Sequence, residues 1–94
     1  MYFFTFHCRP KQGSTSAEVF VGAYINCWIH ANDISTAEKI ATFRINEIGW
    51  EILKKEEANH VNKAQYSSLS KAREYYEQAL IDKWVLVVHG YHAN

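Results

Sequence analysis

The sequence shows no excess of charge of either sign. Its 94 residues contain 10 Lys and Arg and 10 Asp and Glu, so the formal net charge is +0 at pH 7. Nucleic acids and anionic membranes are bound through basic surfaces, which a balanced composition does not favour. We therefore predict that the protein binds neither nucleic acid nor membrane.

The sequence also lacks the motifs of common catalytic, metal and cofactor sites. Neither the CxxC nor the HxxxH spacing of a zinc site occurs, although 5 His and 2 Cys are present. No glycine-rich phosphate-binding loop is present either. We therefore expect no metal, no cofactor and no catalytic residue. The least favoured hypothesis is an enzyme that uses His7, His30 or His89 as a general base.

Long apolar segments are missing as well. The apolar N-terminal run ends at His7 and follows no basic segment, so it is too short for a signal peptide or a membrane span. We expect a cytoplasmic location, where thiols stay reduced. Cys8 and Cys27 lie within apolar patterns, and we therefore expect both to be buried and free.

The stretch Val19–His30 is the most informative part of the chain. Its side chains alternate between two sets, which predicts one long central strand with two different faces. The apolar set, expected to face the core, consists of Val19, Val21, Ala23, Ile25, Cys27 and Ile29. The aromatic and polar set contains Phe20, Tyr24, Asn26, Trp28 and His30. Tyr2–Arg9 alternates too, and it predicts a strand that pairs antiparallel with Val19–His30 through the loop Lys11–Ser16.

Two helices are predicted farther along the chain. Ser35–Glu38 has the pattern of a capping box, and apolar residues at helical spacing predict a helix over about Thr36–Ile48 that Gly49 ends. Ser68 or Ser70 is expected to cap the second helix. The buried stripe predicted for this second helix consists of Leu69, Ala72, Tyr76, Ala79 and Leu80.

Two or three further strands accompany these helices. Trp50–Glu56 becomes polar toward its end, which is typical of a strand at the edge of a sheet. The continuous apolar run Trp84–Tyr91 predicts an inner strand that is buried on both faces. Whether Val61–Tyr66 forms another short strand stays open.

The order of these elements determines the predicted fold class. Without the first strand the order is βαβ(β)αβ, which resembles the ferredoxin-like split βαβ arrangement. We predict one α+β domain over residues 1–94, a ferredoxin-like two-layer sandwich with two helices on one face of an antiparallel sheet and an extra N-terminal strand. The opposite sheet face, which carries Phe20, Tyr24 and Trp28, would then be bare.

Several short stretches resemble a family of short bacterial proteins of uncharacterised function. They are Gly22–Ile29, with the sequence GAYINCWI, the pairs Ala37-Glu38 and Gly49-Trp50, and Tyr75–Ala79. The resemblance covers most of the chain. It implies a bacterial, cytosolic α+β domain, and it carries no known chemistry and no catalytic residue.

The bare aromatic face is the strongest functional signal, because large exposed apolar patches mark interaction sites. We predict a small interaction or regulatory module that forms a homodimer through this sheet face. The residues predicted to bind the partner or ligand are Phe20, Tyr24, Asn26, Trp28, His30 and His7. The alternatives are a different protein partner, or a small-molecule-binding domain with an aromatic pocket at the sheet or dimer interface. The face could also be covered by the chain itself, through Lys11–Ser16 or through Glu57–Ser67.

Overall fold

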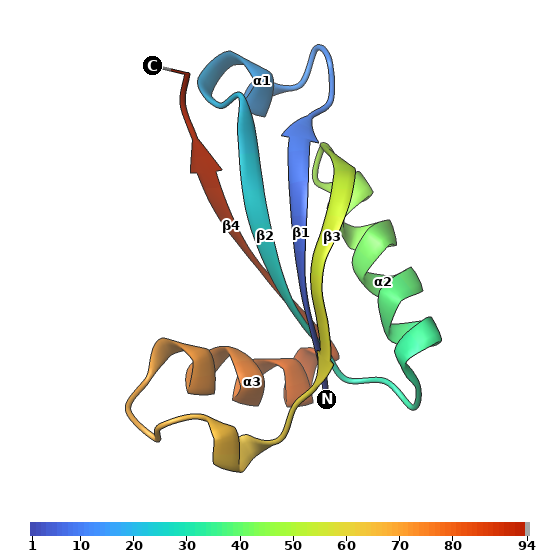
Figure 1. Cartoon of the computed structure of the whole chain (residues 1–94), viewed down its shortest axis with the longest axis vertical. Helices are drawn as coiled ribbons and strands as arrows, with labels where there is room; N and C mark the ends of the chain where they lie inside the picture. Colours follow the sequence, from blue (N-terminus) through green and yellow to red (C-terminus); the bar gives the residue numbers. More distant parts are fainter. Residues whose placement is uncertain (94) are drawn as a thin grey trace.

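Four antiparallel strands form one sheet in the order β3-β1-β2-β4 (Figure 1). The computed structural model describes residues 1–93. The strands are β1 (Tyr2–Pro10), β2 (Gly22–Ile29), β3 (Trp50–His60) and β4 (Trp84–Tyr91). The helices are α1 (Thr15–Val19), α2 (Ile34–Glu47) and α3 (Lys71–Asp82), with a 3-10 turn η1 at Lys63–Gln65. The prediction of an α+β protein with an antiparallel sheet is confirmed.

Strand β1 lies in the middle of the sheet, so its description as an extra N-terminal strand is wrong. It pairs with β2 on one side and with β3 on the other. Phe4, Phe6 and Cys8 at its alternate positions are almost fully buried in the core cluster under α2. The resulting strand order differs from that of a ferredoxin-like sandwich, and the ferredoxin-like prediction is therefore not confirmed.

Strand β4 is an edge strand, whereas its continuous apolar run predicted an inner position. Trp84 and Leu86 pack against the core cluster under α2, while Val85 and Val87 pack against the cluster under α3. The run is apolar because helices lie near both faces of the strand at this end. A continuous apolar run indicates that both faces of a strand are covered. It does not indicate whether the strand pairs with a neighbour on both sides.

The two long helices lie on opposite faces of the sheet, so the prediction that they share one face is wrong (Figure 1). On what we call the α2 face, Ala37, Ala41 and Ile45 of the helix pack against strand residues such as Phe4 and Ile25. On the α3 face, helix α3 covers only the end of the sheet near the N-terminus. The reason is that Trp28 and its neighbours on that face are also large and apolar, and they need cover of their own.

The start of the central strand differs from the prediction. Residues Thr15–Val19 form α1, which is capped by the Ser14 hydroxyl accepting from the Ala17 N–H at 3.3 Å. Strand β2 therefore begins at Gly22, and Val19 and Val21 are exposed instead of buried. Because the helical turn precedes the strand, strand alternation does not extend back to residue 20.

The helix ends follow local hydrogen bonds. Asp33, not Ser35, is the N-cap of α2, because its carboxylate accepts from both the N–H (2.8 Å) and the hydroxyl (3.1 Å) of Thr36. Gly49, with φ +93°, follows the end of α2 as predicted. Ser70 caps α3 by accepting from the Arg73 N–H at 3.1 Å, which selects one of the two predicted serines.

The segment between β3 and α3 contains no strand. Strand β3 runs to His60, and Val61–Tyr66 contains the turn η1 instead. Leu69 precedes α3 and is exposed, and Leu80 is also exposed, so the predicted stripe is wrong at both ends. Its middle is right, since Tyr76 and Ala79 are buried.

Candidate functional site: the α3 face of the sheet

The α3 face presents its side chains in rows that cross the strands. Strand register places Val85, Trp28, Phe3 and Asn59 in the row nearest the N-terminus. The next row contains Val87, Asn26, Thr5 and Glu57, and the third contains His89, Tyr24 and His7. Helix α3 covers the first row and leaves the third open. The face is therefore divided into a closed end and an open end.

Trp28 lies at the closed end and is only 4% exposed. Its indole N–H donates to the Tyr66 hydroxyl at 3.2 Å, and the rings of Phe3 and Tyr75 pack against it at centroid distances of 4.9 and 5.1 Å. Because Tyr66 belongs to Glu57–Ser67, that segment and α3 together cover Trp28. The alternative that the chain covers its own face thus holds for this end.

The open end carries an aromatic trio, which we define as His7, Tyr24 and Tyr91. The His7 and Tyr24 rings stack at 4.6 Å with an interplanar angle of 13°, and His7 Nε2 lies 2.7 Å from the Tyr91 hydroxyl. Tyr24 is 44% exposed and Tyr91 is 37% exposed. The Tyr91 ring lies over Gly22, its cross-strand partner, where any Cβ would collide with the tyrosine. Glycine at this position is thus what admits the ring.

A pocket of about 510 Å³ lies at the closed end, on the side of β3. Side chains from the first two rows and from the segment after β3 line it, among them Phe3, Asn26, Trp28, Glu57 and Tyr66. The Thr5 hydroxyl donates to Asn26 Oδ1 at 2.8 Å and fixes the amide in place. Two predicted site residues, Asn26 and Trp28, therefore share a cavity with residues that the sequence did not single out.

The other two predicted residues lie elsewhere. Phe20 packs on the α2 side, with its ring centroid 6.3 Å from that of Trp50, because it precedes the strand. His30 follows β2 and is exposed, and it lines a separate pocket of about 370 Å³ with residues of α2. Neither Phe20 nor His30 belongs to the α3 face. The prediction that Phe20 shares a sheet face with Tyr24 and Trp28 is therefore wrong.

The thiols are poor nucleophiles in this structure. Cys8 and Cys27 are fully buried and free, as predicted. Burial raises the pKa of Cys8 to about 11. Burial, and to a smaller extent the neighbouring Cys8, also raises the pKa of Cys27. Both thiols are therefore protonated near neutral pH, where the thiolate would be the reactive form.

Residues 1–93 contain neither a cluster of metal ligands nor a membrane-spanning helix. No three His, Cys, Asp or Glu side chains in this part of the chain are close enough together to hold a metal ion. None of the helices described has the length and apolar character needed to cross a membrane.

The α3 face combines aromatic rings, an amide and a carboxylate around a cavity. His7, Tyr24, Asn26 and Trp28 all lie on this face. The resemblance to a family of short bacterial proteins stays a prediction. No family model matches the chain, and no curated protein or solved structure is significantly similar to it.

Proposed function

We propose that the protein is a small non-catalytic interaction module that works as a homodimer, and that two copies join through the edge strand β4. The observation that carries this proposal is the contrast between the two edges of the sheet. An unpaired edge strand can add a strand from another chain, and proteins protect such edges with charges and bulges. One edge of this sheet is protected in this way and the other is not.

Strand β3 is the protected edge. Its charged residues are Glu51, Lys54, Lys55, Glu56 and Glu57. Its register with β1 shifts twice, between Thr5 and Phe6 and between His7 and Cys8. Charges and irregular pairing both disfavour the addition of another strand.

Strand β4 lacks both protections. Its sequence, WVLVVHGY, contains no Lys, Arg, Asp or Glu, and its register with β2 is continuous over eight residue pairs from Gly22↔Tyr91 to Ile29↔Trp84. Some of its own apolar side chains are exposed, including Val88, which is 39% exposed. On the α2 face the Arg44 guanidinium lies 4.5 Å from the Trp84 ring centroid and 5.5 Å from that of Phe43, which is exposed. The strand at this edge is therefore regular and has no Lys, Arg, Asp or Glu of its own, and the Arg44 cation beside it lies on the Trp84 ring.

A second copy is the partner that these features favour. Two antiparallel β4 strands related by a two-fold axis at Val88 would place Val85 of one copy beside Tyr91 of the other, because directly paired residues share a face of the sheet. The interface would be isologous, as in most homodimers. The apolar surfaces beside the two β4 strands would then cover each other, and no like charges would meet. This geometry replaces a dimer through the sheet face, since α3 already covers Trp28.

Light scattering after size-exclusion chromatography tests the proposal. We expect the parent protein to have the mass of a dimer at micromolar concentration and Val88→Lys to have that of a monomer with unchanged circular dichroism. Leu53→Lys is the matched control, because Leu53 lies on the β3 edge and is 49% exposed. It should leave the dimer intact.

Three results would contradict the proposal: a monomeric parent, a Val88→Lys protein that remains dimeric, or a dimer that only Leu53→Lys dissociates. Tyr24→Ser separates an edge dimer from a face dimer. The substitution should leave the edge dimer largely assembled, whereas a dimer through the open end of the α3 face would dissociate.

A further inference from the structure

We propose that the pocket of about 510 Å³ on the α3 face binds a small organic cation that carries an aromatic ring, such as an arylalkyl ammonium. Its volume is in the range typical of small-molecule sites. The pocket lies on a face of the sheet and not at the β4 edge, so this proposal is independent of the homodimer.

The charge of the pocket sets the charge of the ligand. Among the described residues that line it, Glu57 is the only Asp, Glu, Lys or Arg, and His60, counted as neutral at pH 7, also lines it. Neighbouring charges on β3 have protein partners, since Lys55 pairs with Glu38 at 2.7 Å and Lys54 lies 4.0 Å from Glu56. Glu57 forms no ion pair within residues 1–93. A protonated amine would supply the missing partner.

The aromatic side chains of the first row favour a ligand that also has an aromatic ring. Phe3 and Trp28 both line the cavity, and their rings meet at 4.9 Å with an interplanar angle of 60°. The half-buried Phe3 offers most of the aromatic surface, because Trp28 is only 4% exposed. In the adjacent row, Thr5 separates Asn26 from Glu57 on the two neighbouring strands. The pocket thus places polar groups beside aromatic rings. A ligand with a cationic end and an aromatic end matches both rows, and aromatic faces also attract cations.

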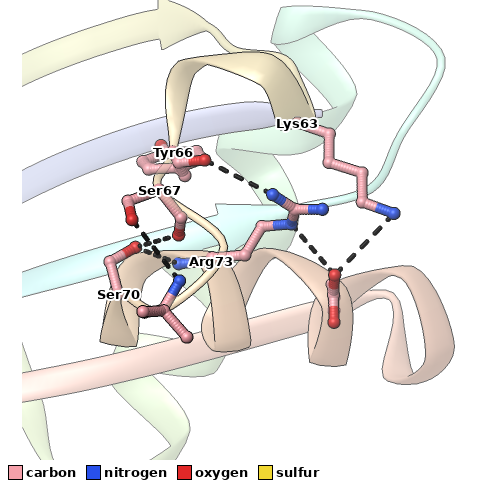
Figure 2. A network of polar contacts seen from close by, with 7 residues as sticks. Lys63, Tyr66, Ser67, Ser70 and Arg73 are labelled. Carbon is pink, nitrogen blue, oxygen red and sulfur yellow. Dashed lines mark hydrogen bonds and ion pairs between the residues drawn. The ribbon is translucent and has the colours of Figure 1, made fainter.

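The outer wall of the pocket is held in place by α3 (Figure 2). Arg73 donates to the backbone carbonyl of Tyr66 at 3.3 Å and to Glu77 at 2.9 Å. Lys63 pairs with the same Glu77 carboxylate at 3.7 Å. The Tyr66 hydroxyl in turn accepts from Trp28 at 3.2 Å. A wall fixed at both ends loses little conformational freedom when a ligand binds, which favours affinity.

Phenethylamine and the neutral 2-phenylethanol are matched probes, since they differ mainly in charge. Each is titrated into the isotope-labelled protein while NMR follows the Trp28 indole N–H and the Asn26 side-chain amide. A ligand of this size should bind with a Kd of about 1 mM. We expect the amine to shift both signals and the alcohol to bind about tenfold more weakly, because a charged hydrogen bond is lost.

Glu57→Gln should weaken amine binding about tenfold and remove the preference over the alcohol. Glu56→Gln is the matched control, because it removes the same charge from the next residue, which is not among those lining the pocket. It should change amine binding by less than about twofold.

Glu57 is exposed, and the variant's NMR spectrum verifies its fold. The proposal is overturned if the amine shifts neither signal at about ten times the expected Kd. It is also overturned if the alcohol binds as well as the amine, or if Glu56→Gln and Glu57→Gln weaken binding equally.

Discussion

The same strands build two faces of very different character. On the α2 face, the side chains of the two inner strands are buried, since Cys8, Ala23, Ile25 and Cys27 are all 0% exposed. On the α3 face, burial ends after the first row, and Tyr24 in the third row is 44% exposed. The difference shows how one sheet separates its two tasks. The α2 face supplies the core, while the α3 face is closed at one end and exposes aromatic side chains at the other.

The largest effect is expected from a charge buried on the α2 face, which tests whether this face forms the core. Ala41 of α2 is 0% exposed, so Ala41→Asp buries a carboxylate without a partner. Such burial costs several kcal/mol, a large part of a total stability of about 5–15 kcal/mol. We expect the variant to lose its cooperative thermal transition by circular dichroism. In the folded parent a thiol reagent should modify Cys8 and Cys27 slowly, whereas in the variant both should react at once.

Phe43→Asp is the matched control for this experiment, because Phe43 lies on the exposed side of the same helix. It should fold and keep both thiols protected. An Ala41→Asp protein that melts like the parent would show that the α2 face does not form the core described above.

The second test compares the two ends of the α3 face. Trp28→Ala removes a buried indole and should lower the free energy of unfolding by about 3–5 kcal/mol. Tyr24→Ala removes a half-exposed ring stacked on His7, and about 1 kcal/mol is expected. Urea unfolding at one fixed protein concentration measures both, because any dimer adds a concentration-dependent term. Equal losses would mean that the two ends do not differ.

The sequence predicted the parts of the fold that depend on local pattern. The alternation from Ala23 to Ile29 identified the central strand, Gly49 marked the end of α2, and the thiols were correctly expected to be buried. Strand order and the side on which α3 packs could not be predicted. An apolar position shows that a face is covered, but it does not show which helix covers it or which strand lies alongside.

The lining of the pocket was predictable only for the residues that β2 contributes. Asn26 and Trp28 follow from the alternation of β2 and do line the pocket. Glu57 and Tyr66 come from other elements, and strand register and η1 bring them there. Tyr91 carries a weak signal, because an aromatic residue often lies across from a strand glycine, but the pairing with Gly22 is known only from the register.

The smallest expected effect on stability concerns the N-cap of α2, which contributes through local hydrogen bonds and not through burial on either face. Asp33 accepts from the N–H and the hydroxyl of Thr36, and these hydrogen bonds lower the pKa of its carboxyl. Asp33→Ala should therefore destabilise the protein slightly at about pH 7. Ser35→Ala should have no measurable effect, because Ser35 is not the cap.

The pH dependence separates the charge of Asp33 from its role as an acceptor. A carboxyl whose pKa is lower in the folded state stabilises the protein fully above its unfolded-state pKa, and this stabilisation is lost as the pH falls through the folded-state pKa. The difference between parent and Asp33→Ala in urea midpoint should therefore shrink from about pH 7 to about pH 3. Asp33→Asn keeps an oxygen acceptor without the charge, so it should lie between them at neutral pH. If Ser35→Ala costs more stability than Asp33→Ala, the helix is capped by its serine, and α2 begins later than the structure places it.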